Sequence, residues 1–500
     1  MADAPRAVGA SLRGHAYHHA WAARSALALI QPGSDLELVV VEHFSPIDGP
    51  AMSAPTVEVA DLVRYYGGRE AETARRVEVI QFKHSDAEAD VAFRASDAAK
   101  TIKKFAAAFA DHGQTLGSDR RNDVLRFELV TNRPIHPDLV EAVTTLAAGE
   151  TIGIGTKTQV ATVLRASDLK GPDVSAFFSR LVLSGSSGNL GSARRAAGQV
   201  IASWSEPADL EARLRLKELL SLVEDAATGR APLGHGVIAV DVLGALGLAE
   251  RGDLFPAKAS FPPVERPIAR KVLEHIVAKL DQSQLPLIVH ATGGMGKTVL
   301  MQGLSVKLSE NGLAVLFDGF GGGEWRDPSD ARHRASRGLL QLVNQIAAKG
   351  LCDPILPGRN DPSDLLRAAR RRFEAAAVAL RDQGLIGGLS LVLDAVDHSA
   401  EQAKMMGEES FASQLLKTLT ITPIDGVRLV ISCRTERLGI TRGDVECPDF
   451  VVPRFTPGET LRVIRAERPE SGETDIAILT SRAQGNPRIL AALLRSADAL

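Results

Sequence analysis

Hydrophobic positions in the first 150 residues alternate between helical and strand-like spacing. Apolar residues recur every three or four positions at 16–30 and at 96–113, which predicts two amphipathic helices, the second opened by Ser96 and closed by Gly113. Runs rich in valine and leucine predict strands at 35–44, 56–66, 75–85 and 124–132. This alternation predicts an α/β domain over residues 1–150.

The remaining chain shows two further patterns. Residues 151–262 contain helical segments separated by the turn-rich stretch "SGSSGNLGS", which predicts a helical connector. From residue 263, the apolar strands "PLIVHA", "LAVLFDGF", "LSLVLDAVD" and "VRLVISCR" alternate with helical segments, as in a parallel sheet covered on both faces. We therefore expect an α/β multidomain protein, with a parallel-sheet domain over 263–500.

Composition narrows the function classes. The 58 basic and 61 acidic residues give a net charge of −3, so any contact with nucleic acid has to rest on a local basic surface. Three cysteines without a C-x-x-C pair predict a reducing compartment and exclude a disulfide framework. No uncharged apolar stretch approaches the roughly 20 residues that span a bilayer. We expect a cytoplasmic protein without membrane contact.

The stretch "ATGGMGKT" at 291–298 follows an apolar strand and opens a helix. Its three glycines let backbone N–H groups converge on a phosphate chain, Lys297 can meet the β- and γ-phosphates, and the Thr298 hydroxyl can ligate Mg²⁺. Alanine stands at the first position, where the usual pattern has glycine. The residues expected to bind ATP here are Ala291, Thr292, Gly293, Gly294, Met295, Gly296, Lys297, Thr298 and Val299.

Further candidates for this site follow later strands. Asp394 ends an apolar strand, where a carboxylate can hold the Mg²⁺ shell together with Thr298, and Asp397 can orient water. Arg434 ends the next strand and can sense the γ-phosphate, and Pro487 lies in a Gly-Asn-Pro turn. The alternatives are a helix cap or turn for each acid, a solvated arginine and a simple turn.

The motifs "GGMGKT", "LVLDAVD", "ISCR" and "GNP" occur in the order found in the STAND branch of P-loop NTPases, which includes NACHT proteins, and residues 263–500 resemble that family. The resemblance implies that ATP binding switches a closed monomer to a homo-oligomer. It also implies a sensor C-terminal to residue 500 for a trigger such as a phage protein, so we expect this chain to be the N-terminal part of something larger.

The strand "RRVEVIQFKHS" carries Gln81 and Lys83 at its end, and a hairpin through "GGREAETA" brings Asp61 beside them. Phosphodiester hydrolysis needs oxygen ligands that hold Mg²⁺ and a cation that orients the attacking water. Asp61, Gln81 and the Phe82 carbonyl can supply the metal ligands, and Lys83 can act on the water. This predicts a catalytic site in the first domain.

Residues 10–135 resemble the PD-(D/E)XK nucleases, in the version whose last acid is glutamine, as in Mrr-like enzymes and the double-stranded-DNA nuclease effectors of bacterial antiviral systems. The resemblance includes "GHAYHHAWAARSAL", "VVVEHF", "VADLV", "QFKHS" and "FELVTNR", and implies a restriction-endonuclease-like fold with Glu42 as a further acidic ligand. An inactive nuclease-like fold and an unrelated α/β domain are the alternatives.

Two clusters of charged or polar residues have alternative interpretations. The basic residues Lys100, Lys103, Lys104, Arg120 and Arg121 can follow a DNA backbone, but a solvated helix face is the favoured interpretation. The histidines at positions 15, 18 and 19 lack the spacing of a structural zinc site, and we expect them on a helix surface.

Together, these patterns predict an antiviral defence protein. An ATP-dependent STAND switch would oligomerise and activate a magnesium-dependent endonuclease that cuts double-stranded DNA when a phage component is sensed. The alternative is a STAND-type signalling or transcription regulator without catalysis, whose first domain only binds a partner. Convergence of Asp61 and Lys83 favours the nuclease.

Overall fold

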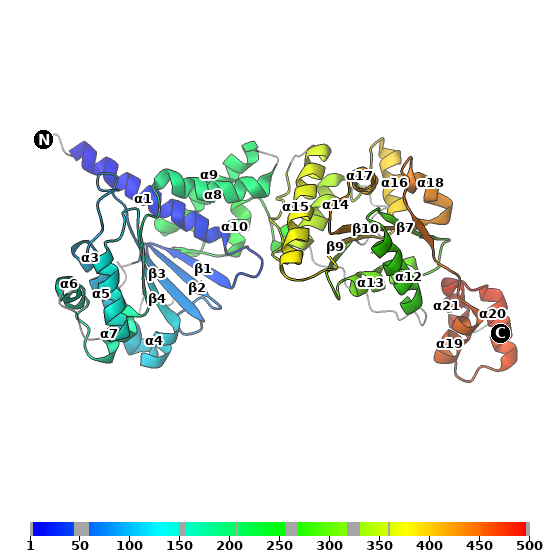
Figure 1. Ribbon diagram of the computed structural model, residues 1–500, viewed down its shortest axis with the longest axis horizontal. Coiled ribbons are helices and arrows are strands. Elements are labelled where there is room, and N and C mark those ends of the chain that lie inside the picture. Colours follow the sequence, from blue (N-terminus) through cyan, green and yellow to red (C-terminus); the bar gives the residue numbers. More distant parts are fainter. Residues whose placement is uncertain are drawn as a thin grey trace. The chain divides into compact units, whose positions relative to one another are not determined.

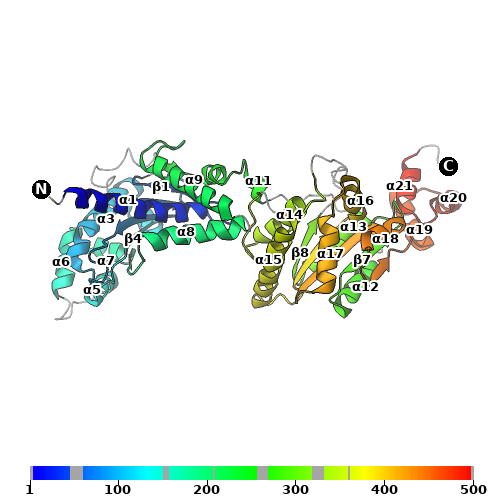
Figure 2. The same cartoon turned by 90° about the horizontal axis from the view of Figure 1, so that it is seen from above.

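The computed structural model of the chain describes residues 4–44, 60–149, 157–206, 209–255, 269–317, 331–358 and 361–496. It divides into two compact units, each considered by itself. Unit 1 comprises Met1–Trp204 and Asp209–Asp253, and unit 2 comprises Ser205–Ala208 and Leu254–Leu500. The ribbon in Figures 1 and 2 labels their helices and strands.

Unit 1 is built on a mixed six-stranded sheet with the order β5-β4-β3-β2-β1-β6. The strands are β1 Leu36–Val41, β2 Leu62–Tyr66, β3 Arg76–Lys83, β4 Leu125–Thr131, β5 Leu181–Ser184 and β6 Gly236–Val237. Strands β1, β2 and β3 pair antiparallel in sequence, and β3, β4 and β5 pair parallel. The four predicted strands are confirmed, although the predicted positions 56–59 lie outside the described residues.

Helices cover both faces of this sheet. They are α1 Ala4–Leu27, α3 Ala95–Leu116, α4 Ser118–Val124, α5 Pro137–Ala148, α6 Lys157–Ser167, α7 Pro172–Phe178, α8 Leu190–Ser205, α9 Asp209–Ala227, α10 Ala239–Ala245 and α11 Arg251–Leu254. Val77 and Val79 of β3 share a core with α3, α5, α6 and α7, which gather beside β3 and β4 in Figure 1. Phe82 contacts the rings of Tyr17 and Trp21 on α1. Because successive strand residues face opposite ways, α1 covers the other face.

Helix α3 differs from its predicted bounds because Gly113 lies inside it. A Cβ at Gly113 would come 2.8 Å from the Arg121 guanidinium, so glycine makes room for that side chain. Arg121 stacks on Phe109 at 3.7 Å and donates a 2.7 Å hydrogen bond to Asp173. Arg121 is therefore a buried packing residue and cannot follow a DNA backbone.

The predicted helical connector at 151–262 does not form a separate unit. Strand β5 pairs with β4 and strand β6 pairs with β1, so this stretch extends the sheet of the first domain at both edges. Phe177 and Phe178 of α7 are buried in the same core as β3 and β4. Unit 1 consequently extends to Asp253 instead of ending near residue 150.

Unit 2 contains a parallel five-stranded sheet with the order β11-β7-β10-β9-β8, as the alternation of strands and helices predicted. Its strands are β7 Leu287–Ala291, β8 Leu313–Phe317, β9 Leu389–Leu393, β10 Val427–Arg434 and β11 Asp449–Val451. Leu391 and Leu393 enter the core with α14, α15 and α17, whereas Val392 enters the core with α12 and α13. Both faces of the sheet are therefore covered.

The helices of unit 2 include those that pack on the sheet and three C-terminal helices, α19, α20 and α21, which form a group of their own. They are α12 Ala269–Gln282, α13 Lys297–Leu308, α14 Ala335–Ala347, α15 Pro362–Asp382, α16 Val396–Met406, α17 Phe411–Ile421, α18 Leu438–Arg442, α19 Pro457–Glu467, α20 Glu473–Ala483 and α21 Pro487–Arg495. Helices α19, α20 and α21 share a small core that includes Ile464, Leu479 and Leu490. Among the helices of the described residues, none has the length and apolarity that crossing a membrane requires.

Replacing Phe127 with alanine should destabilise unit 1 strongly. Its buried ring lies 5.1 Å from that of Phe105 and 5.5 Å from that of Phe177, so the change leaves a cavity and should cost about 3–5 kcal/mol. Urea unfolding followed by tryptophan fluorescence measures the loss. Val182→Ala, at a side chain 53% exposed, is the matched control, and equal stabilities of the two variants would contradict this account of the core.

Candidate functional sites

The four residues predicted to be catalytic lie together at one end of the strands β1, β2 and β3 in unit 1. Glu42 follows β1, Asp61 precedes β2, and Gln81 and Lys83 end β3. The Glu42 N–H donates to the Asp61 carbonyl at 3.0 Å, and the Asp61 N–H donates to the Ile80 carbonyl at 3.1 Å. These bonds extend the pairing of β1 with β2 and of β2 with β3 by one residue. The pairing therefore places the predicted residues at the same end of the three strands.

The Asp61 carboxylate is held by the backbone of β3. Its Oδ2 atom accepts a 2.6 Å hydrogen bond from the Phe82 N–H, and this fixes the side chain beside the end of the strand. Gln81, directly opposite, is only 6% exposed. A fixed carboxylate and a buried amide oxygen are donors that suit Mg²⁺, so the residues present fit the predicted metal.

Lys83 lies in a polar but partly desolvated environment. Burial lowers the pKa of its ammonium group, the neighbouring Asp61 carboxylate raises it, and Lys104 and Lys100 of α3 lower it further. Lys83 follows Phe82 on β3, so its side chain points to the opposite face of the sheet from Phe82. This is the face that α3 covers. A lysine with a depressed pKa beside a carboxylate can orient water as the ammonium and can accept a proton once it is the neutral amine.

Glu42 is held ionised by two histidines that the sequence analysis placed on a helix surface. The neighbouring His18 lowers the pKa of Glu42 to about 2, burial opposes this shift, and His15, at 3.2 Å, contributes in the same direction as His18. Both histidines belong to α1, and His18 also lies 3.7 Å from Asp61. The interpretation as a surface residue is therefore wrong for His18, which is 17% exposed because α1 passes over this end of the sheet, whereas His15 is exposed as expected.

In unit 2, the glycine-rich loop joins β7 to α13 and lies against the Gly-Asn-Pro turn. The Asn486 side-chain amide donates to the Gly293 carbonyl at 3.1 Å, and the Arg488 N–H donates to the Gly294 carbonyl at 3.2 Å. Gly294 has a φ of +82°, and a Cβ there would come 2.8 Å from the Cβ of Arg488. Both the backbone conformation and the close approach thus require glycine at this position.

Lys297 and Thr298 connect the loop to the strand ends. The Lys297 ammonium donates to the Ala291 and Thr292 carbonyls at 2.8 and 3.1 Å, and burial lowers its pKa while Asp397 and Asp394 raise it. The Thr298 hydroxyl donates to Asp394 at 2.7 Å. The lysine, the hydroxyl and the two acids therefore meet at one end of the sheet, as the sequence predicted.

Asp397 faces two arginines. Its Oδ2 atom lies 3.9 Å from Nε of Arg434 and 3.5 Å from Nη1 of Arg437, although the residue is only 2% exposed. Sequence analysis identified Arg434 but missed Arg437, which lies in a one-turn 3₁₀ helix just beyond β10. The sequence feature that could have identified Arg437 is the second arginine of "CRTER", three residues after Arg434.

A cavity of about 410 Å³ opens at this loop. Ten of the predicted residues line it, namely Gly293, Gly294, Met295, Gly296, Lys297, Thr298, Val299, Asp397, Arg434 and Pro487. Ala395, His398 and Arg488, which the sequence analysis did not identify, complete the lining. Ala291, Thr292 and Asp394 are not among the lining residues. The cavity thus presents backbone amides, one lysine and two arginines to a common space.

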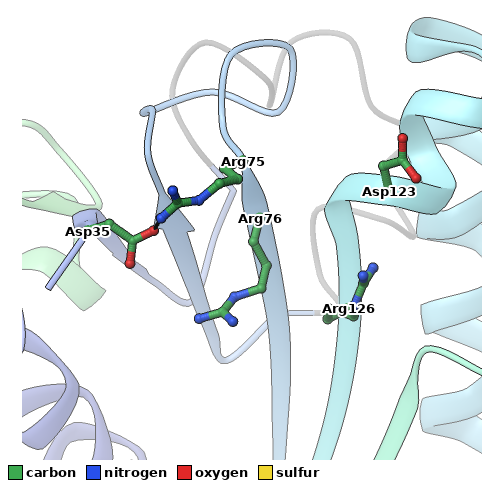
Figure 3. A pocket seen from close by; sticks show the side chains of 5 residues that line it. All are labelled: Asp35, Arg75, Arg76, Asp123 and Arg126. Atoms are coloured by element: carbon green, nitrogen blue, oxygen red, sulfur yellow. Dashed lines mark hydrogen bonds and ion pairs between the residues drawn. The ribbon is translucent and has the colours of Figure 1, made fainter.

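A second hollow of unit 1, about 320 Å³ in volume, lies at the opposite end of β3 from Lys83. Asp35, Arg75, Arg76, Asp123 and Arg126 line it, and Figure 3 shows Arg75 pointing toward Asp35. The protein itself engages the three arginines. Arg75 pairs with Asp35, Arg76 pairs with Glu78, and Arg126 donates to the Leu125 carbonyl. We therefore assign no ligand to this hollow.

Comparison with known proteins identifies no family. No protein-family model and no curated protein matches the chain. Among solved structures, the Cap4 SAVED/CARF-domain containing receptor of Acinetobacter baumannii with the cyclic trinucleotide 2'3'3'-cAAA has 10% identity and a TM-score of 0.28, covering 83% of this chain and 95% of that one. A second structure of the receptor gives the same values. Similarity at this level defines neither the fold nor the function of this chain.

The low pKa of Glu42 predicts a pH-dependent contribution to stability. Its folded-state pKa of about 2 lies below the ordinary value of 4.5, so the ionised carboxylate stabilises the fold. The contribution is complete above pH 4.5 and is lost as the pH falls toward 2. Glu42→Gln should lower the melting temperature at pH 7, and the difference from wild type should shrink by pH 3. A difference of the same size at both pH values would contradict the assigned pKa.

Proposed function

We propose that this chain is an antiviral defence protein in which ATP binding by unit 2 leads to oligomerisation and activates a DNA endonuclease in unit 1 when a phage component is sensed. The observation that carries the proposal is the meeting of Asp61, Gln81 and Lys83 at one edge of a sheet. The resemblance of these residues to PD-(D/E)XK nucleases, and of the glycine-rich loop to STAND NTPases, supplies the expected chemistry.

In the proposed nuclease site, Asp61, Gln81 and the Phe82 carbonyl would hold Mg²⁺, and Glu42 would be a further acidic ligand. Bound magnesium would polarise the scissile phosphate of double-stranded DNA. Lys83 then positions the attacking water and takes its proton. Burial, the first cause of its lowered pKa, increases the fraction of Lys83 that is a neutral amine, and only the neutral amine can accept the proton of the water.

In the proposed ATP site, the N–H groups of the loop surround the phosphates and Lys297 neutralises their charge. Thr298 and Asp394, already hydrogen-bonded to each other, would hold the magnesium ion of ATP. Asp397 orients water, and Arg434 contacts the γ-phosphate. Asn486 and Arg488, on either side of Pro487, donate to the loop carbonyls and connect this site to the helices α19, α20 and α21.

We expect ATP binding to control DNA cleavage because an unregulated nuclease would be harmful to the cell. An enzyme that cuts any duplex DNA damages its own cell, so it has to stay inactive until the trigger is present. Oligomerisation on ATP binding raises the effective concentration of nuclease sites and lets paired sites cut both strands. We therefore place ATP binding before DNA cleavage.

Lys83→Ala should slow magnesium-dependent cleavage of plasmid DNA by about 10²–10⁴-fold, the usual contribution of a positioned proton acceptor. Cleavage by the full-length protein, with its sensor, is measured on gels with ATP and a lysate of phage-infected cells present. Lys170→Ala, at an exposed lysine between α6 and α7, should cut as fast as wild type. Equal rates for wild type and Lys83→Ala would remove the lysine from the mechanism. No cleavage by any of the three would favour the non-catalytic regulator.

Lys297→Ala should weaken ATP binding at least about tenfold, because a hydrogen bond to a charged group contributes about 1.5–3 kcal/mol. Binding of a fluorescent ATP analogue measures the change. Lys307→Ala is the matched control, because this lysine lies on the same helix but pairs with Glu310. An unchanged affinity in Lys297→Ala would show that the loop does not bind the phosphates.

A further inference from the structure

We propose that His15, His18 and Glu42 form a binding site for a divalent first-row transition-metal ion such as Zn²⁺ or Mn²⁺, next to the predicted magnesium position, with which it would share the Glu42 carboxylate. His15 and His18 lie on α1, and Glu42, which follows β1, lies at least 24 positions further along the chain. They are the group within the described residues whose histidine and carboxylate ligand atoms all lie within 4.8 Å of one another.

The ligand atoms are spaced for a single ion. Nδ1 of His15 lies 3.2 Å from Oε1 of Glu42, and Nδ1 of His18 lies 4.0 Å from the same oxygen. Two ligands of one zinc ion can be up to about 4.2 Å apart, because each bond is about 2.1 Å long. His15 is 54% exposed, and its Nδ1 atom already faces Glu42. The cluster therefore needs only small side-chain movements to coordinate a metal.

His18 shows an unsatisfied coordination position. Its Nδ1 atom is buried and makes no hydrogen bond among the residues that the structure describes. A buried polar nitrogen without a partner is costly, and a metal ion between it and Glu42 would satisfy it. The ring is also held in place, because it lies 5.4 Å from the ring of Phe82. Its orientation toward Glu42 is thus set by packing.

The second nitrogen of His18 has the environment expected around a metal-binding histidine. Nε2 lies 3.7 Å from Oδ2 of Asp61. Histidines that bind metal through one nitrogen commonly present the other to a carboxylate, which fixes the tautomer and makes the ligand more basic. In this arrangement His18 would ligate the ion through Nδ1 and face Asp61 through Nε2.

The chemistry of the ligands distinguishes this site from the proposed magnesium site. Imidazole nitrogen suits zinc and other transition ions, whereas Mg²⁺ prefers oxygen ligands in octahedral geometry. Two imidazoles and one carboxylate are a common set for an open zinc site, in which water takes the fourth position. We therefore expect the cluster to select a transition ion over Mg²⁺.

Metal binding tests this inference without DNA or ATP, so its result does not depend on the proposed nuclease. The 500-residue chain is treated with EDTA, exchanged into metal-free buffer and titrated with Zn²⁺ against a chromophoric chelator. A parallel titration with Co²⁺ reports imidazole ligation through visible absorption. We expect wild type to bind Zn²⁺ through this site even with millimolar Mg²⁺ present.

Three variants assign the binding to the cluster. His15→Ala and Glu42→Gln should each weaken zinc binding at least about tenfold, and circular dichroism checks that both remain folded. His19→Ala is the matched control on the same helix, since His19 lies 3.9 Å from Glu224, and it should bind zinc like wild type. The inference is overturned if wild type binds no zinc, if His15→Ala and Glu42→Gln keep the wild-type affinity, or if His19→Ala loses as much. If the protein cleaves DNA with Mg²⁺ as the only added metal, the proposed nuclease remains supported even when the zinc titrations overturn this inference.

Discussion

Asp61 is hydrogen-bonded through its carbonyl, its N–H group and its carboxylate, and these bonds determine where the polar groups of unit 1 meet. The backbone bonds join the end of β1 to the start of β2 and to β3, and the carboxylate accepts the Phe82 N–H. A shift of one residue in the β2–β3 register would turn Gln81 and Lys83 toward α1 and separate them from Asp61. The proposed chemistry therefore depends on strand register more than on any single ion pair.

A similar constraint acts in unit 2, where the backbone of one turn holds the glycine-rich loop. Asn486 and Arg488 both donate to loop carbonyls, and Gly294 is the residue that allows their approach. Lys297 bonds the carbonyls of the same loop, and Thr298 bonds Asp394. Phosphate binding at this loop would have to redirect the lysine from these carbonyls. This exchange offers a physical route by which a ligand changes the contacts of the loop.

Local patterns predicted the parts of the fold that depend on local residues. The strands β1, β2, β3 and β4 followed from alternating apolar positions, and the loop at 291–298 followed from its glycines between a strand and a helix. The same reasoning failed for β5 and β6, because short edge strands carry little periodicity and their partners lie far away in sequence. The glycine at position 113 predicts a helix end, but the helix continues through it and the glycine makes room for Arg121.

The same distinction between local and distant determinants applies to the residues of the candidate sites. Asp61, Gln81 and Lys83 could be grouped from sequence because a hairpin joins their strands. The proximity of His15 and His18 to Glu42 could not, because it depends on the path of α1 across the sheet. Burial also changed the interpretation of individual side chains, as for Arg121, which is 3% exposed. Tertiary packing thus decides what a periodic pattern leaves open.

The central claim is that ATP binding in unit 2 controls DNA cleavage in unit 1. The most direct test compares plasmid degradation by the full-length protein, with its sensor, as wild type and as Lys297→Ala, each with and without ATP and a lysate of phage-infected cells. The account predicts that wild type cuts only when ATP and lysate are both present and that Lys297→Ala does not cut. Cleavage by Lys297→Ala at the wild-type rate, in a protein shown not to bind ATP, would contradict it.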